Sequence, residues 1–223
     1  MSSAFVFGGT GAVGSDLVKL LGETSQFAKV ALFGRRNNDK ATDSKFIQKV
    51  VDFEKIDEIS EDVKDFDVGF CALGASYYDP KELFYRVDHD YVMSIAKLAK
   101  DNGVKMFVLV SSSGADEKAC ANYSKVKGQV EREVEELGFD TLVIMRPAAI
   151  EAKREKYLFL ERVGMAVLRP LIKLNLANNL TSTTYQVASA MVMATRIEEK
   201  GTHIWTNARI IEESKNYNIT NDN

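Results

Sequence analysis

Short apolar runs alternate along the chain with longer stretches in which apolar residues recur at helical spacing. Most of the short runs are apolar at nearly every position, a pattern typical of parallel strands that are covered on both faces. They predict six strands and a weaker seventh: Ala4–Phe7, Lys29–Phe33, Lys49–Val51, Val68–Leu73, Met106–Val110, Thr141–Met145 and His203–Thr206. The helical spacing predicts five helices: Val13–Gly22, Leu83–Asn102, Tyr123–Leu137, Glu155–Leu168 and Tyr185–Ile197. Alternation of this kind predicts an α/β fold with a doubly wound parallel sheet.

The same pattern bounds the domain organisation. Gly103 and Gly138 directly follow two of the predicted helices, where left-handed C-terminal caps are expected. We find no internal repeat and no low-complexity linker, and only the tail after Glu213 looks loose. A chain of 223 residues with these features is expected to form a single domain over residues 1–223.

Composition narrows the class of protein. A net charge of −3 gives no electrostatic reason to bind nucleic acid or an anionic membrane as the main activity. The first apolar run is too short for a secretory signal, and no stretch reads as a transmembrane segment. The two cysteines, Cys71 and Cys120, give no disulfide framework and fit a reducing compartment. We therefore expect a cytoplasmic protein, with the nucleus left open.

A cluster of glycines follows the first strand, in the stretch "AFVFGGTGAVGSDL". Gly9, Gly11 and Gly14 form G-x-G-x-x-G, and Gly8, Gly11 and Gly14 form G-x-x-G-x-x-G. Between a strand and a helix, this spacing is the fingerprint of a dinucleotide site, in which backbone N–H groups meet a pyrophosphate. A tight structural turn is the alternative, and no Lys-Ser or Lys-Thr pair follows to indicate a P-loop. The residues expected to contact the cofactor here are Gly8, Thr10, Gly11, Ala12, Val13 and Gly14.

The sequence "GRR" directly follows the second predicted strand. An acidic residue at this place would bind the ribose hydroxyls of NAD. Gly34 instead leaves space, and Arg35 and Arg36 can hold a 2′-phosphate through charge-assisted hydrogen bonds, which predicts NADP(H). The alternative is a pair of solvated arginines in a loop.

Two further strand ends are candidates for the cofactor. Asp52, with Phe53 in "VVDFEK", lies where such folds recognise the adenine, although Asp52 is equally suited to cap a helix. Ala72, Leu73 and Gly74 follow the fourth strand and are expected to pass beneath the cofactor.

The chemistry is expected from "LVSSSGADEKACANYSKVKGQVE". Tyr123 and Lys127 are four residues apart and lie on one face of a predicted helix. An ammonium beside a phenol stabilises the phenolate, and such a tyrosine passes a proton to or from a hydroxyl or carbonyl oxygen. A serine from 111–113 can polarise the same oxygen.

Taken together, these motifs resemble the short-chain dehydrogenase/reductase superfamily, and more narrowly its atypical branch, the Tat-interacting oxidoreductase (HIV Tat-interactive protein 2-like) family. The likeness covers about residues 4–150 and is carried by "GRR", "VVDFEK", "DVGFCALG", "VDHDYV", "SSSGAD", "VKGQVEREVEELGFD" and "RPAAI". It implies a Rossmann-like fold in which Tyr123 is the proton donor and acceptor, Lys127 holds the nicotinamide ribose and Ser112 contacts the substrate oxygen. Arg35 and Arg36 would bind NADP. The loop that lines the nicotinamide would contain Pro147, Ala148 and Ile150.

The chain departs from this family at two places. Many members complete a proton relay with an asparagine, where this chain offers Asp88, so the relay is altered or lost. The apolar and basic segment 151–182 carries no family motif. Its charged residues exclude a spanning helix. We expect a small helical cap over the substrate, with an interaction surface for a partner or a membrane interface as the alternative.

Other reactive residues have ordinary explanations. His89 and His203 are the only histidines, and without a nearby cysteine cluster no metal site is expected. Cys120 is interpreted as a loop cysteine rather than an oxidant sensor.

The sequence thus predicts an NADP(H)-dependent oxidoreductase that acts on an unknown carbonyl or hydroxyl compound. The alternative is an NADP(H)-binding regulatory protein with little turnover that controls protein partners. Substrate, physiological direction and oligomeric state stay open.

Overall fold

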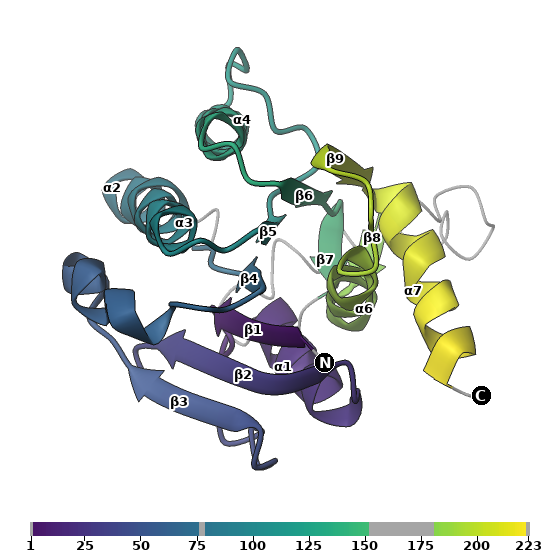
Figure 1. Ribbon diagram of the computed structural model, residues 1–223. Coiled ribbons are helices and arrows are strands. Elements are labelled where there is room, and N and C mark those ends of the chain that lie inside the picture. Colours follow the sequence, from purple (N-terminus) through teal and green to yellow (C-terminus); the bar gives the residue numbers. More distant parts are fainter. Residues whose placement is uncertain (1, 76–78, 152–180, 222–223) are drawn as a thin grey trace.

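The computed structural model describes residues 2–75, 79–151 and 181–221. A single sheet of seven parallel strands runs through it in the order β3-β2-β1-β4-β5-β6-β9 (Figure 1). Its strands are β1 (Ser2–Phe7), β2 (Phe27–Gly34), β3 (Phe46–Val50), β4 (Val68–Cys71), β5 (Met106–Val110), β6 (Thr141–Arg146) and β9 (Gly201–Thr206). The order reverses between β1 and β4. In open α/β sheets, ligands bind at such a switch point, outside the carboxyl ends of the strands.

Helices cover both faces of this sheet, because each strand sends alternate side chains to opposite sides. Ala4 and Val6 of β1 join the core under α1 and α6, whereas Phe5 and Phe7 join the core under η1, α3 and α4. Figure 1 shows these two groups of helices on opposite sides of the strands. The helical segments are α1 (Ala12–Glu23), η1 (Phe53–Asp62), α2 (Lys81–Tyr85), η2 (Arg86–Asp90), α3 (Tyr91–Asp101), α4 (Asn122–Glu136), α6 (Thr184–Ala194) and α7 (Asn207–Asn221). The predicted doubly wound α/β fold is confirmed.

Several boundaries differ from those the pattern predicts. The strand predicted from Lys49 begins at Phe46. The helix predicted over Leu83–Asn102 is a succession of α2, the π-helical turn η2 and α3. The helix predicted over Glu155–Leu168 lies outside the described residues.

The tail after Glu213 is not loose, contrary to the prediction, because α7 continues to Asn221. Ile210 and Tyr217 lie seven residues apart, two helical turns, and both are buried in the core that contains α6. These two residues pack α7 against the core, although most of their neighbours in the sequence are polar.

Two short strands frame the segment expected to cover the substrate. β7 (Ala149–Glu151) pairs in parallel with β8 (Thr181–Thr183), and together they form a separate two-stranded sheet. Residues 152–180 lie between them and outside the described part of the chain.

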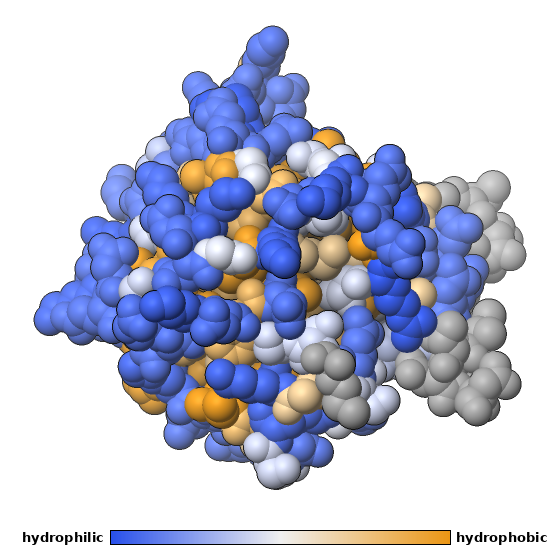
Figure 2. Space-filling view, in the orientation of Figure 1, coloured by the Kyte–Doolittle hydropathy of each residue, from blue (hydrophilic) through white to orange (hydrophobic). Residues whose placement is uncertain are grey.

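The surface is mainly hydrophilic, and Figure 2 shows apolar residues only in patches between charged and polar ones. Within the described residues, Ile47 and Val50 on β3 and Ile204 on β9 stay exposed, and both strands are edges of the sheet. None of the described helices is both long and apolar enough to span a bilayer.

Candidate functional site

The glycine loop joins β1 to α1 at the switch point. Gly8 has a φ of +85°, which favours glycine, and a Cβ there would lie 2.6 Å from the carbonyl group of Ala72. A Cβ on Gly14 would lie 2.1 Å from the carbonyl oxygen of Gly8. These two glycines therefore let α1, its entry loop and the loop after β4 meet backbone to backbone.

The N-terminus of α1 is free of side-chain caps. Gly11 is the N-cap residue, and the first turn carries no acidic residue. The N–H groups of Ala12 and Val13 lack intrahelical acceptors and suit an anion. Thr10 and Gly11 are exposed, whereas the side chain of Val13 belongs to the core.

Asn38 is a residue of this loop system that the sequence did not indicate. Its buried side chain donates from Nδ2 to the carbonyl oxygen of Gly9 at 2.7 Å. Gln48 of β3 accepts the Asn38 N–H through Oε1 at 2.7 Å, so the asparagine ties the glycine loop to the edge of the sheet. No motif marks it, because its partners are distant in sequence.

Arg35 and Arg36 directly follow β2, and both are exposed. In the described part of the chain neither guanidinium forms an ion pair, which leaves both available to an anionic group. A Cβ on Gly34 would make only an ordinary contact, 3.5 Å from the Arg36 carbonyl oxygen, so packing alone does not demand glycine there.

The residues expected near the adenine have separate roles. Asp52 caps η1, accepting the Glu54 N–H through Oδ1 at 3.0 Å, as the capping alternative predicts. The buried ring of Phe53 stacks on Tyr91 with centroids 5.1 Å apart, which commits it to the core. Ala72 and Leu73 are half-buried beside the glycine loop, and Gly74 is exposed.

Tyr123 and Lys127 lie one helical turn apart on α4. Lys127 is buried, and its Nζ lies 2.6 Å from Oδ1 of Asp88 on η2. Burial opposes the charged ammonium, but the fields of Asp88 and Tyr123 outweigh it and hold the pKa of Lys127 above its usual value. The Asp88 carboxylate that pairs with Lys127 also contacts Ala75, which connects the ammonium to the loop after β4.

Both carboxylate oxygens of Asp88 have a partner, Lys127 at Oδ1 and the Ala75 N–H at Oδ2. Its side chain is 1% exposed, and Oδ2 accepts the Ala75 N–H at 2.6 Å. Asp88 is therefore the counter-ion of Lys127.

The serine loop meets the loop after β6. The Ser113 N–H donates to the Pro147 carbonyl oxygen at 2.8 Å. Ser111 is buried, with no hydrogen-bond partner for its hydroxyl among the described residues, whereas the half-buried Ser112 donates to the Ser113 carbonyl oxygen at 3.3 Å. The geometry does not choose between Ser111 and Ser112, so Ser112 stays a prediction.

The other residues predicted to line the nicotinamide occupy the same region. The Ala148 N–H donates to Oδ1 of Asn207 at 2.9 Å, which anchors this loop to α7. Ile150 packs against the core from β7.

Gly128, next to Lys127, is a second feature that the sequence did not indicate. A Cβ there would lie 2.2 Å from the backbone nitrogen of Glu117. The glycine thus allows the loop that follows the serines to press directly onto α4.

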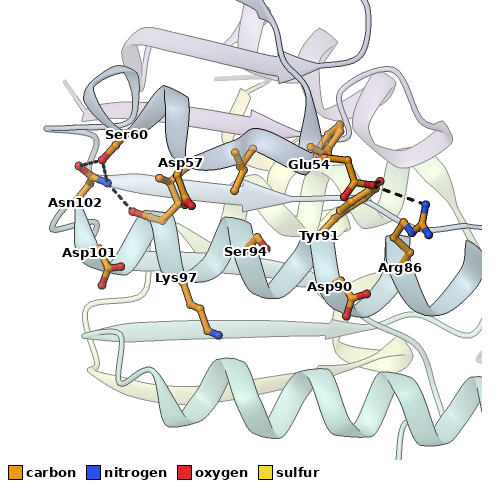
Figure 3. Close-up of a pocket in the computed structure, with 13 residues that line it drawn as sticks. Glu54, Asp57, Ser60, Arg86, Asp90, Tyr91, Ser94, Lys97, Asp101 and Asn102 are labelled. Carbon is orange, nitrogen blue, oxygen red and sulfur yellow. Dashed lines mark hydrogen bonds and ion pairs between the residues drawn. The ribbon is translucent and has the colours of Figure 1, made fainter.

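A cavity of about 470 Å³ lies elsewhere, between η1 and α3 (Figure 3). Its walls carry charged and polar side chains, including Glu54, Lys97 and Asp101. Of the predicted site residues only Phe53 lines it, so it is not the predicted cofactor or substrate site.

The histidines and cysteines give no second reactive centre. His89 bonds to Asp90 and Glu133, and His203 contacts the Glu199 carbonyl oxygen at 3.0 Å. In the described ranges no three of the histidine, cysteine and acidic side chains gather as metal ligands do. Cys120 is exposed and Cys71 buried.

Comparison with known proteins agrees with this geometry. A family model described as NAD(P)H-binding matches residues 8–167. Protein HTATIP2 of Rattus norvegicus is 42% identical over 157 residues, which cover 69% of this chain and 65% of the rat protein. The match therefore spans less than two thirds of that relative. A protein named FMP52, mitochondrial, of Debaryomyces hansenii is 37% identical over 162 residues, which cover 69% of each chain.

Solved structures share the fold. A structure described as MoeE5 in complex with UDP-glucose and NAD superposes with a TM-score of 0.69 at 14% identity, covering 97% of this chain and 81% of that one. At this identity the likeness speaks for the fold alone.

The expected cytoplasmic location is contradicted by these relatives, because FMP52 proteins of several fungi are named mitochondrial. The cysteine argument separates oxidising from reducing compartments. It does not tell one reducing compartment from another, and this is why it misled.

Proposed function

The chain belongs to the NAD(P)H-binding family, and on this premise we propose that it is an NADP(H)-dependent oxidoreductase of the short-chain dehydrogenase/reductase type, acting on a carbonyl or hydroxyl group. The observation that carries the proposal is the position of Lys127. Its ammonium is buried on α4, one turn after Tyr123, and pairs with Asp88, whose carboxylate also accepts the Ala75 N–H in the loop after β4. A tyrosine and a lysine thus meet beside the switch point of the sheet.

The residues along this edge fit a dinucleotide phosphate. The uncapped N-terminus of α1 suits the pyrophosphate, and Arg35 and Arg36 suit a 2′-phosphate. Lys127 is the donor for the nicotinamide ribose. Bound there, the nicotinamide would supply or accept a hydride.

The protein's own side chains would handle the proton. Tyr123 donates or accepts it at the phenolic oxygen, and Lys127 stabilises the phenolate that forms. Ser112 holds the reacting oxygen by a hydrogen bond. Phe84 packs against the Tyr123 ring with centroids 5.3 Å apart, which supports the orientation of the phenol.

Three further assignments belong to this proposal. Residues 1–223 form one domain, and the segment 151–182 within it covers the substrate. The parallel pair β7–β8 supports this role for the segment, because it holds the two ends together next to the Pro147 loop. By similarity to the FMP52 proteins, the chain acts in mitochondria.

A second candidate function is cofactor-dependent control of protein partners with little turnover. The ion pair between Asp88 and Lys127 favours it, because the carboxylate takes one of the three ammonium N–H donors and leaves fewer for the ribose hydroxyls.

Tyr123→Phe separates the two candidates. It removes the phenolic oxygen while keeping the ring against Phe84, so NADPH affinity measured by calorimetry should be unchanged. Reduction of a carbonyl panel, followed by NADPH absorbance, should fall about 100-fold or more. Tyr85→Phe is the control, because its ring stacks on His89 at 4.5 Å and serves no predicted catalytic role.

If Tyr123→Phe reduces the panel as fast as the parent, the proton does not come from Tyr123 and the proposed mechanism is wrong. Tight NADPH binding with no turnover by either protein would favour the regulatory candidate.

A further inference from the structure

Asp88 and Lys127 form a buried ion pair that the assigned chemistry does not explain. The two side chains come from η2 and α4, are 1% and 7% exposed, and approach to 2.6 Å. A charge in such a place is costly unless it is paired, and each of these two groups supplies the opposite charge for the other.

The backbone fixes the carboxylate independently of the lysine. Oδ2 accepts the Ala75 N–H at 2.6 Å, and Ala75 follows the strand end at which the cofactor is expected. Asp88 therefore joins α4 to the loop after β4 through its two oxygens.

Among the described residues, three titratable groups act on the charge of the Lys127 ammonium, and they come from η2, α4 and β4. They are Asp88 of η2, Tyr123 of α4 and Cys71 of β4. Burial raises the pKa of the Cys71 thiol to about 11, so that thiol is neutral at physiological pH. Asp88 is thus the one fixed negative charge among these three.

We propose that Asp88 is a positioning residue that keeps two protons on the Tyr123–Lys127 pair, so that Tyr123 works as a neutral phenol and the site is poised for carbonyl reduction. The claim that the site favours carbonyl reduction rests on the proposed function. The claim that Asp88 keeps both protons on the Tyr123–Lys127 pair does not, because it follows from the charge of the carboxylate alone.

The balance of the reduction is simple. A carbonyl takes one hydride at carbon and one proton at oxygen, and the nicotinamide is oxidised as the hydride leaves it. The proton comes from the Tyr123 phenol, whose O–H bond breaks, and the resulting phenolate is stabilised by the Lys127 ammonium until solvent returns a proton.

Asp88→Asn tests the proposal because it removes the charge at constant shape, and the amide oxygen can still accept the Ala75 N–H. Without the carboxylate, the pair loses its first proton at lower pH, whichever of the two groups releases it. Ultraviolet titration of tyrosinate absorbance, with the matching Tyr123→Phe protein subtracted, reports the phenol. A second reading, the 15N signal of the Lys127 Nζ, reports the ammonium.

We expect the first proton loss to move down by about one to three pH units in Asp88→Asn. Asp88→Glu keeps a carboxylate, so its first proton loss should occur at nearly the same pH as in the parent. Glu131→Gln is the matched control, since Glu131 is a 5% exposed carboxylate of α4 paired with Arg146 rather than with Lys127. The same first proton loss in Asp88→Asn as in the parent would overturn the proposal.

The parent protein provides a test that needs no folded variant at position 88. The Lys127 15N signal, assigned by its loss in Lys127→Arg, should keep its ammonium form at a pH where exposed lysines have lost theirs. A Lys127 that loses its proton before the exposed lysines would refute the role of Asp88.

Activity separates this proposal from the proposed function. If reduction occurs, the alkaline limb of kcat should move to lower pH in Asp88→Asn and stay in place in Glu131→Gln. A shifted titration without turnover would support the role of Asp88 and contradict the proposed oxidoreductase activity. Turnover with an unshifted titration would support the oxidoreductase activity and contradict the role of Asp88.

Discussion

The carbonyl oxygen of Gly8 faces the α-carbon of Gly14 so closely that a Cβ on Gly14 would lie 2.1 Å from it. Because both atoms belong to backbone, neither can swing away. Gly14→Ala should therefore lower the free energy of unfolding by about 1–3 kcal/mol. It should also weaken NADPH and NADH binding together, since the pyrophosphate loop is displaced.

Gly22, near the end of the same helix, supplies the control for this prediction. A Cβ there would make an ordinary contact, 3.4 Å from Phe46, so Gly22→Ala should be neutral or gain up to about 1 kcal/mol from helix propensity. Urea unfolding of both variants compares them. Equal stabilities for the two would show that the Gly8–Gly14 contact has no energetic weight.

Arg35 and Arg36 are expected to select NADP(H) over NAD(H). A charge-assisted contact to one guanidinium contributes about 1.5–3 kcal/mol, or roughly ten- to a hundredfold in affinity. NADPH should bind at least about tenfold more tightly than NADH, and replacing both arginines by alanine should remove most of the difference. Added salt should narrow it as well, because both arginines are exposed.

Calorimetric titration of both cofactors measures this preference. Lys19→Ala combined with Lys215→Ala removes the same charge from two exposed positions on α1 and α7 and should leave it unchanged. Equal affinities for the two cofactors in the parent would take the arginines out of the site.

Asn38 is predicted to hold the glycine loop in place for either cofactor. Asn38→Ala leaves the Gly9 carbonyl oxygen without its 2.7 Å donor, so the affinities for NADPH and NADH should fall by similar factors. Stability should fall by about 1–3 kcal/mol. Gln48→Ala removes the acceptor of the Asn38 N–H. It should lower the free energy of unfolding and leave the affinities for NADPH and NADH unchanged. A change confined to NADPH would contradict this assignment.

Cys71 predicts a loss of stability at high pH. Its thiol pKa is raised to about 11 by burial, above the value of an unfolded thiol near ~8.5. The folded protein therefore keeps this proton longer than the unfolded chain, and the resulting contribution is complete below ~8.5 and lost as pH rises through about 11. By pH 11 the loss of unfolding free energy amounts to about 3 kcal/mol.

Urea unfolding at several values between pH 8 and 11 should show that loss in the parent and in Cys120→Ala but not in Cys71→Ala. A chromophoric disulfide reagent should find one reactive thiol, that of the exposed Cys120, until the chain unfolds. Two reactive thiols in the native protein would contradict the burial of Cys71.

The sequence predicted the sheet well because strands covered on both faces read as unbroken apolar runs. It placed the start of β3 too late, since an edge strand mixes exposed and half-buried positions such as Ile47 and Gln48. The glycine fingerprint indicated Gly14 as a cofactor residue, and the structure shows that Gly14 also permits the close approach of α1 to Gly8.

The site was harder to predict where it depends on distant partners. Asp88 and Lys127 are 39 positions apart, and only the folded chain shows that they form an ion pair. Asn38 bonds to Gly9 through a loop that no motif marks. Local spacing indicates which groups can react, whereas tertiary packing decides which charges surround them.

The place of β9 in the sheet also bears on biosynthesis. β6 ends at Arg146, and the strand that flanks it ends at Thr206, 60 residues later. At a translation rate of about 5–20 residues per second, β6 waits about 3–12 seconds for that neighbour. During this interval its outer N–H and C=O groups form an open edge, which other chains can pair with and aggregate upon. A nascent chain of this protein is therefore most in need of a chaperone after β6 has emerged from the ribosome and before β9 has.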